Sequence, residues 1–389
     1  MDRRYDPEDL RGTLRPWLRD HVMPFWLSRI EDRDGFLEAL DSEGRPVRSE
    51  RRHVLVQARL TYVFSHAALL SPEPRYAEAA AHGYAFLTRA CRAPDGGWYR
   101  AVTSAGAPAD ATRDFYDQAF VLFALAWYAR ASGERAPLDL AEATWAFLET
   151  RLSDPRHGGF VEEYLPGGEP KLPRRQNPHM HLLEATLALH AATRKGVWLD
   201  RAAALVDLFD RRLFDRGTGT LIEFLTEDLI PVAGPAGLWR EPGHHFEWVW
   251  LLHDFHRHAG RPDALAVADR LYDFAVRHGL ETDVGKPGGV FDGVNRDGSL
   301  AADAKTFWPQ TEYIKACVAR AEDHRDPQAW SRVEDHMRVL AAHYLRPDGA
   351  SWHNQIARDG TSLQALTPAR VLYHFFLAMA EVDRVSSRP

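Results

Sequence analysis

Cysteine is scarce in this 389-residue sequence: only Cys91 and Cys317 occur, and both lie within amphipathic helical patterns. Two such residues indicate buried thiols in a reducing compartment rather than a disulfide framework. The sequence has no uncharged apolar run of about eighteen residues, so no membrane-spanning helix is predicted. Lysine and arginine form no run long enough to follow a phosphate backbone, and the net charge is −7. We therefore expect neither a membrane nor a nucleic-acid partner.

The first residues lack the apolar segment that a secretory signal needs. The segment MDRRYDPEDL is charged throughout. Together with the cysteine content, this indicates a cytoplasmic protein. Tryptophan and histidine, in contrast, are abundant, with 12 and 19 residues. Tryptophan suits a hydrophobic core and also the face of a sugar ring, so its position has to decide between the two.

A glycine-containing turn followed by an aromatic or apolar residue recurs six times. The turns contain Gly35, Gly97, Gly159, Gly219, Gly289 and Gly349, at steps of 62, 62, 60, 70 and 60 residues. A short segment and a second polar turn follow each of them, which predicts small β-hairpins. Such a period indicates a repeat architecture.

Between these turns, apolar residues at three- and four-residue spacing predict twelve helices. We expect them at 8–30, 51–71, 74–92, 113–132, 136–153, 179–194, 197–215, 244–260, 262–281, 305–323, 326–347 and 365–385. Twelve helices in six pairs, with hairpins at one end, predict an all-α fold, an (α/α)6 barrel of two concentric rings. We expect residues 1–389 to form this barrel as one domain. An open solenoid, which would need polar terminal repeats, is the alternative.

Six of these helices carry polar or ionisable residues within apolar patterns, and their partners resemble ordinary amphipathic surface helices. We place the six on the inner ring: 51–71, 113–132, 179–194, 244–260, 305–323 and 365–385. One notable residue from each recurs at steps of 57, 65, 63, 64 and 66, namely Arg59, Tyr116, His181, His244, Trp308 and His374. A period near sixty puts them at similar depth around one axis, which predicts a single pocket.

Two of the inner helices contain the pattern His-x-x-Glu. It pairs His181 with Glu184 and His244 with Glu247. Residues three apart share a helix face, so each glutamate is predicted to accept a hydrogen bond from one imidazole nitrogen and set its tautomer. A metal site, a glycosidase carboxylate pair that recruits Glu312, and purely structural histidines remain alternatives. The neighbouring His179 and His245 are expected to support the site.

Four segments at these positions resemble the N-acylglucosamine 2-epimerase superfamily, and most closely its mannose isomerase and aldose–ketose isomerase branch. They are YDQAF (116–120), RQNPHMHLLEA (175–185), PGHHFEW (242–248) and FWPQTE (307–312). The resemblance implies an (α/α)6 barrel, with His244 and His374 as the acid/base pair and no metal or organic cofactor. For sugar binding, the resemblance implies Arg59, Tyr116, Asn177, His181, Glu247 and Trp308. We expect two further glutamates, Glu184 and Glu312, to belong to the same binding site.

Histidine suits such a reaction because imidazole, with an unperturbed pKa of about 6.5, can give or take a proton at neutral pH. We expect an aldose–ketose isomerase, with D-mannose and D-fructose as the favoured pair, that works through an enediol(ate). A small-molecule sugar is the expected partner, and the protein is expected to be a monomer or homodimer. A sugar 2-epimerase, an (α/α)6 glycoside hydrolase and a non-catalytic sugar-binding protein are the alternatives. A sulfonated sugar would need a further cationic contact, from Arg175 or Arg240.

Overall fold

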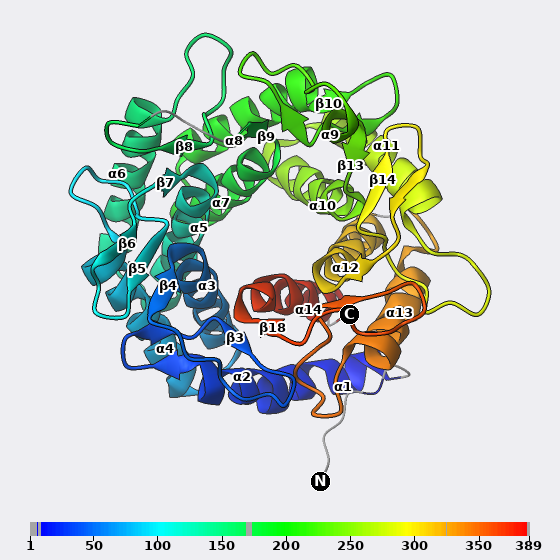
Figure 1. Ribbon diagram of the computed structural model, residues 1–389, viewed down its shortest axis with the longest axis horizontal. Coiled ribbons are helices and arrows are strands. Elements are labelled where there is room, and N and C mark those ends of the chain that lie inside the picture. The colour runs from blue at the N-terminus through cyan, green and yellow to red at the C-terminus, as the bar shows by residue number, and fades with distance from the viewer. Residues whose placement is uncertain (1–5, 7–8, 169–172, 324, 387–389) are drawn as a thin grey trace.

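A computed structural model describes residues 6, 9–168, 173–323 and 325–386. In this part of the chain the helices form two concentric rings, which Figure 1 shows end-on. The inner ring consists of α3 (Val54–Leu70), α5 (Phe115–Ser132), α7 (Asn177–Thr193), α10 (Pro242–Ala259), α12 (Phe307–Glu322) and α14 (Leu372–Ser386). Consecutive inner helices contact one another and α14 contacts α3, so the ring closes. The predicted (α/α)6 barrel is confirmed, and an open solenoid is excluded.

The outer ring supplies the second helix of each pair. Its first member is one continuous helix made of α1 (Leu10–Trp17), η1 (Leu18–Val22) and α2 (Met23–Ile30). The other five are α4 (Pro74–Phe86) with η2 (Leu87–Cys91), α6 (Ala136–Arg151), α8 (Gly196–Leu208) with η3 (Phe209–Leu213), α11 (Pro262–Gly279), and α13 (Ala329–Val339) with η4 (Leu340–Tyr344). Outer helices bury one face, whereas inner helices are buried on nearly every side. The assignment of helices to the two rings is as predicted.

The inner helices α3, α5, α12 and α14 begin later than the sequence pattern predicts, whereas α7 and α10 begin two residues earlier, at 177 and 242 instead of 179 and 244. A short strand precedes each of the six. These strands are β4 (Arg51–His53), β7 (Arg113–Asp114), β9 (Arg174–Arg175), β13 (Trp239–Arg240), β16 (Lys305–Thr306) and β18 (Thr367–Pro368). The last of them leads into α14 through the 3₁₀ turn η5 (Ala369–Val371). At the other terminus, the predicted helix 8–30 starts at a residue outside the described part of the chain.

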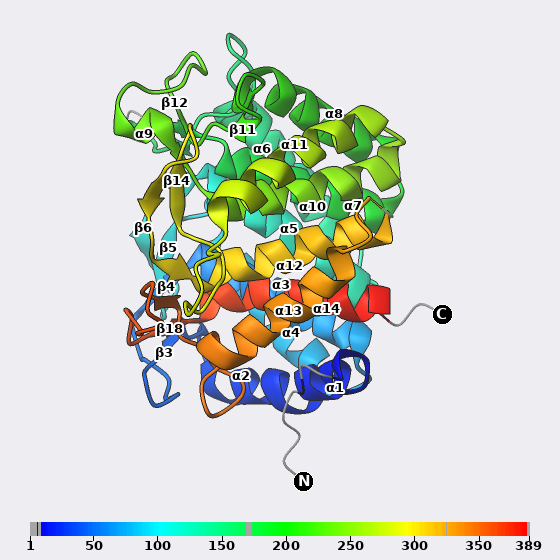
Figure 2. The same cartoon turned by 90° about the vertical axis from the view of Figure 1, so that its right-hand side faces the viewer.

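Each strand before an inner helix pairs antiparallel with a strand from a neighbouring repeat. The partners are β5 (Ala101–Thr103), β8 (Glu163–Tyr164), β12 (Phe224–Leu225), β14 (Gly293–Asn295), β17 (Gln355–Ile356) and β3 (Ala39–Leu40), in the order of the strands above. The last pair joins the two ends of the chain, since Thr367 lies opposite Leu40. The strands therefore form a girdle at one end of the barrel, here called the hairpin end (Figure 2).

The remaining small elements also lie in the connections between helices. They are β1 (Glu31–Asp32) with β2 (Gly35–Phe36), β10 (Phe214–Asp215) with β11 (Thr220–Leu221), β6 (Pro108–Asp110), β15 (Leu300–Ala302) and the single-turn helix α9 (Pro235–Leu238).

Five of the six glycine turns are fastened to the following inner helix by a buried side chain. Amide oxygens of Gln57, Gln118 and Gln310 accept the backbone N–H of Phe36, Trp98 and Val290, at 2.8, 2.8 and 2.7 Å. The amide nitrogens donate back to the carbonyls of the same three residues. Two histidines replace the glutamines in the other turns: Nε2 of His179 accepts the N–H of Phe160, and Nε2 of His245 accepts the N–H of Leu221. We call these contacts the turn clasps.

Most tryptophans fill the core rather than a binding surface. Trp17, Trp26, Trp98, Trp198, Trp248 and Trp352 are among the largest fully buried side chains. Trp308, at the start of α12, is only partly buried. Among the described residues, no helix is both long and apolar enough to cross a bilayer.

Candidate functional site

The six residues singled out by their spacing lie together at the hairpin end, within the first two turns of the inner helices. Arg59 donates to the hydroxyl of Tyr116 at 2.7 Å, and the ring of Tyr116 lies 5.1 Å from that of His181. On the other side, Trp308 lies between His244 and His374, with ring centroids 5.0 and 5.5 Å away. The predicted convergence of these side chains is what the structure shows.

Arg59 is buried among aromatic rings. Its guanidinium lies 4.1 Å from the ring centroid of Phe120 and 4.8 Å from that of Tyr373. It also donates to the carbonyl of Arg370 at 3.1 Å, and its Nε has no hydrogen-bond partner in the described structure. A cation held in this way can stabilise a developing negative charge on an oxygen that enters the site.

His181 is oriented by Glu184, as its spacing predicts. Nδ1 lies 3.1 Å from Oε2 of the glutamate, which also accepts a hydrogen bond from the hydroxyl of Tyr373. Burial lowers the pKa of His181 to about 3 and raises the pKa of Glu184. A neutral His181 thus donates from Nδ1 and presents an unprotonated Nε2.

His244 has a different carboxylate partner from the one that its sequence pattern predicts. Nδ1 lies 3.0 Å from Oε2 of Glu223 and 3.4 Å from Oε2 of Glu241. Glu223 also accepts from the side chain of Gln176 and the backbone N–H of Glu241, so it is fixed on several sides. The predicted pairing of His244 with Glu247 is wrong, because the carboxylate of Glu247 makes no hydrogen bond among the described residues.

His374 is held by Glu312, which comes from the neighbouring inner helix. Nδ1 lies 2.7 Å from Oε1 of Glu312, and the other carboxylate oxygen lies 2.7 Å from Nζ of Lys315. Lys315 is fully buried, and its ammonium also lies 4.0 Å from Glu247 and 4.2 Å from the ring of Trp250. Glu312 is therefore neutralised by a cation while it orients a histidine.

The two histidines beside Trp308 differ in charge: His244 is positively charged at neutral pH and His374 is neutral. Burial lowers the pKa of His244, but the charges of Glu241 and Glu223 outweigh it and raise the pKa to about 10. Burial lowers the pKa of His374 well below its usual value, and Arg59 and Lys315 lower it further. At neutral pH one ring is an imidazolium that can donate a proton, and the other is a neutral base. This is the pairing that acid/base catalysis requires.

Two polar groups at the site have unfilled acceptor capacity. Both carboxylate oxygens of Glu247 are buried without a hydrogen-bond partner in the described structure, and Oδ1 of Asn177 is in the same state. Asn177 is the first residue of α7, and Glu247 lies one turn into the neighbouring inner helix α10. Buried acceptors are costly to leave unpaired, so hydroxyl donors of a ligand would stabilise both.

Three groups of side chains lie close enough together to hold a metal ion: His181 with Glu184 and Glu247, Glu223 with Glu241 and His244, and Glu247 with Glu312 and His374. In the second group the protonated His244 already supplies a positive charge, and Lys315 does so beside the third. An ion bound there would have to displace these internal cations. The second and third donor sets therefore fit a metal ion poorly.

Two arginines that a sulfonated sugar could have used are already engaged. Arg175 makes an ion pair of 2.8 Å with the buried Glu162, and Arg240 is buried and donates to Thr220 and to backbone carbonyls. His179 and His245, expected to support the site, instead form turn clasps, each with Nδ1 against the carbonyl four residues earlier.

Glu223, Lys315 and Tyr373 were missed by the sequence analysis. Glu223 lies in the short connection between β11 and β12, where no helical spacing relates it to the inner ring. Lys315 and Tyr373 do lie on inner helices, and Lys315 follows Glu312 at three residues. A lysine at a position that the helical pattern marks as buried is the one indication that could have revealed this charge.

Comparisons with known proteins agree with this architecture. The profile of the N-acylglucosamine 2-epimerase (GlcNAc 2-epimerase) family matches residues 35–378. The chain is 32% identical to the mannose-6-phosphate isomerase of Rhizobium meliloti (strain 1021), over 96% of each chain. It is 29% identical to the D-mannose isomerase of Thermobifida fusca, over 89% of this chain and 88% of that protein.

A solved structure gives the same result. The cellobiose 2-epimerase from Spirochaeta thermophila DSM 6192 superposes with a TM-score of 0.85 at 27% identity, over 98% of this chain and 97% of that one. With the profile match and the likeness over nearly the full length, the chain belongs to the N-acylglucosamine 2-epimerase family.

Proposed function

We propose that this protein is a sugar isomerase that interconverts a free aldose and its ketose, with D-mannose and D-fructose as the preferred pair. Family membership supports a sugar isomerase or epimerase, and the similar proteins named as mannose isomerases favour the isomerase. The observation that carries the proposal is the pair of histidines beside Trp308, one held protonated by Glu223 and Glu241 and one held neutral by burial.

The charge states assign the two roles. The sugar packs on Trp308 between the rings. The imidazolium of His244 protonates the ring oxygen, while the unprotonated Nε2 of His181 accepts the proton of the anomeric hydroxyl. His374 then takes the proton from C2 of the open-chain aldose through Nε2, because Nδ1 is bonded to Glu312. The negative charge that develops on O1 is stabilised by the guanidinium of Arg59 and the hydroxyl of Tyr116.

His374, protonated by this step, completes the isomerisation. His374 returns its proton to C1, while the hydroxyl proton of O2 passes to O1, so the product is the ketose and no external oxidant or reductant is consumed. Return of the proton to the opposite face of C2 would give the epimer instead. The direction of this last transfer separates the two activities.

NMR of D-mannose, D-glucose and D-fructose incubated with the protein in D₂O tests the proposal. We expect fructose from mannose, with deuterium at C1 in those turnovers in which His374 exchanges its proton with D₂O before returning it. His244→Ala and His374→Ala are each expected to lower kcat by about 10²–10⁴-fold. His190→Gln, in the last turn of α7, serves as the matched control. Near-normal turnover by both alanine variants would show that the site is assigned wrongly.

A sugar 2-epimerase is the second candidate, since the solved cellobiose 2-epimerase shares this fold at 27% identity. The same spectra distinguish it, because an epimerase gives glucose from mannose and deuterium at C2. D-mannose 6-phosphate is a useful further substrate in view of the name of the Rhizobium relative. We expect the neutral sugar to be preferred, since Arg175 and Arg240 are both engaged within the protein.

A further inference from the structure

We propose that the barrel carries a second binding site, for a neutral saccharide of two or three rings, at the end opposite the hairpins. A cavity of about 790 Å³ opens there. Each inner helix contributes a side chain from its last turns: Leu70, Arg130, Ala191, His258, Glu322 and Arg384. We call it the far-end cavity. Its volume lies in the upper part of the range of about 300–1,000 Å³ for small-molecule sites, which is more than one hexose needs.

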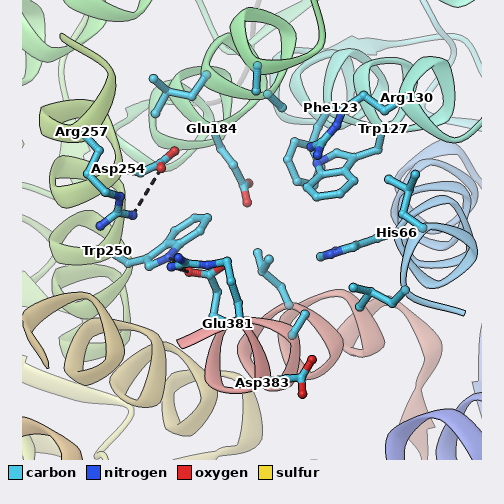
Figure 3. A pocket seen from close by; sticks show the side chains of 18 of the residues that line it. His66, Phe123, Trp127, Arg130, Glu184, Trp250, Asp254, Arg257, Glu381 and Asp383 are labelled. Atoms are coloured by element: carbon cyan, nitrogen blue, oxygen red, sulfur yellow. Dashed lines mark hydrogen bonds and ion pairs between the residues drawn. The ribbon is translucent and has the colours of Figure 1, made fainter. Parts of the chain in front are cut away.

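Aromatic side chains reach into this cavity from opposite sides. Figure 3 shows Trp250 on one wall and His66 with Trp127 on the other. The rings of His66 and Trp127 are stacked at 4.1 Å, and Lys315 lies 4.2 Å from the ring of Trp250. Flat apolar surfaces bounded by polar groups are suited to the C–H face of a pyranose ring.

The charges that line the cavity are nearly balanced and largely paired with one another. Arg257 lies 3.3 Å from Asp254, a contact drawn in Figure 3. Arg384 forms ion pairs with both Glu322 and Glu381, at 2.7 and 2.8 Å. A strongly charged ligand would have to break these pairs, whereas a neutral polyol can hydrogen-bond to their outer edges.

Several polar groups in the cavity are left for a ligand. His66 bonds through Nδ1 to the hydroxyl of Tyr62, and its Nε2 makes no hydrogen bond with any described residue. Burial lowers the pKa of His66 to about 3, so the ring is neutral, and Nε2 donates or accepts according to the tautomer. Arg130 is exposed over the ring of Trp127 and forms no ion pair in the described structure. The carboxyl ends of the helices add backbone acceptors.

The ligand chemistry follows from this inventory. Hydroxyl groups both donate and accept, so they can serve an imidazole nitrogen, paired carboxylates and a guanidinium at once. A hydrocarbon would leave those groups without partners, and an anion would face the carboxylates of Glu381 and Asp254. A neutral saccharide satisfies both the stacking surfaces and the polar groups.

Glu184 connects the far-end cavity with the histidine site. It lines the cavity (Figure 3). Its carboxylate also holds His181 and accepts a hydrogen bond from the hydroxyl of Tyr373. The cavity itself involves neither His244 nor His374. Binding at the far end is therefore testable without any assumption about the reaction.

Isothermal titration calorimetry with trehalose, sucrose and raffinose tests the proposal. These saccharides are neutral and non-reducing, so they have no aldehyde form to react. We expect the wild-type protein to bind at least one of them. Ala191→Trp, which fills the cavity, and His66→Ala, which removes the imidazole nitrogen available to a ligand, are each expected to weaken binding at least tenfold.

The matched controls are Ala146→Trp, at an exposed position of outer helix α6, and His244→Ala. Both should bind as the wild type does, and thermal melting confirms that each variant is folded. Absence of binding to the wild type, or equal binding by the wild type and Ala191→Trp, would overturn the second site. Neither result would bear on mannose turnover, so this proposal and the proposed function fail separately.

Discussion

Replacement of Glu223 by glutamine should lower the pH at which His244, the proposed acid, loses its proton. Glu223 contributes a charge and a hydrogen bond to the elevated pKa of His244, which is about 10. At pH 8 about 1% of the wild-type imidazole is neutral. Without Glu223, burial opposes only the charges of Glu241 and Glu247, and we expect the pKa to fall toward the unperturbed value of about 6.5.

The size of the effect follows from the protonated fraction. With a pKa of about 6.5, roughly 3% of His244 is protonated at pH 8, so kcat/KM should fall by about 30-fold relative to wild type. At pH 6 most of the imidazole is protonated again, and activity should recover to within a few-fold. Recovery at low pH separates loss of the acid from misfolding.

The assay is kcat/KM for mannose between pH 5.5 and pH 10, for the wild type, for Glu223→Gln and for Glu149→Gln. Glu149 is exposed on outer helix α6, so its replacement controls for the loss of one carboxylate charge. If the alkaline limb of Glu223→Gln coincides with that of wild type, His244 is not the acid and the assigned roles are wrong.

The remaining predictions concern the buried groups around the site. Lys315→Met leaves Glu312 without its cation, so we expect the free energy of unfolding in urea to fall by about 3–5 kcal/mol. The same variant should move the acidic limb of kcat/KM to higher pH, because Lys315 helps to lower the pKa of His374. Gln118→Leu removes a turn clasp and should cost about 1–3 kcal/mol for each backbone group left unpaired, measured by urea unfolding, with kcat at pH 7 changed only a few-fold. The folded-state pKa of His244 lies above its unfolded value of about 6.5, so its stabilising contribution is complete below that pH and is lost as the pH rises through about 10. Unfolding curves across this range should show that loss in wild type and a flatter dependence in Glu223→Gln.

The helices and their arrangement were predictable because the information is local. Inner helices are apolar on nearly every side and carry their polar residues near one end, so spacing alone relates Arg59, His181 and His374. The girdle of strands was not predictable in detail. Its pairs join residues far apart in the sequence, such as Leu40 and Thr367, and each strand is only two or three residues long.

The carboxylate of Glu223, which helps to keep His244 protonated, could not be predicted from the sequence. Glu247 lies at the spacing that a helix face requires, but Glu223 approaches from the connection between β11 and β12, whose position depends on the whole fold. Adjacent histidines raise a related difficulty, since His244 and His245 differ by about 100° around α10. One faces the site and the other clasps a turn, and the sequence pattern does not say which.

The turn clasps have a consequence for how this architecture can diversify. An inner helix that is apolar on most sides could rotate about its own axis at little cost in packing, and its catalytic side chains would then miss the substrate. The side chains of Gln57, Gln118, Gln310, His179 and His245 oppose that rotation by fixing five of the six inner helices to their own turns. Loops beyond the turns can therefore change in length and sequence, and with them the range of sugars admitted, while the clasped helices, including α10 with His244, keep their orientation.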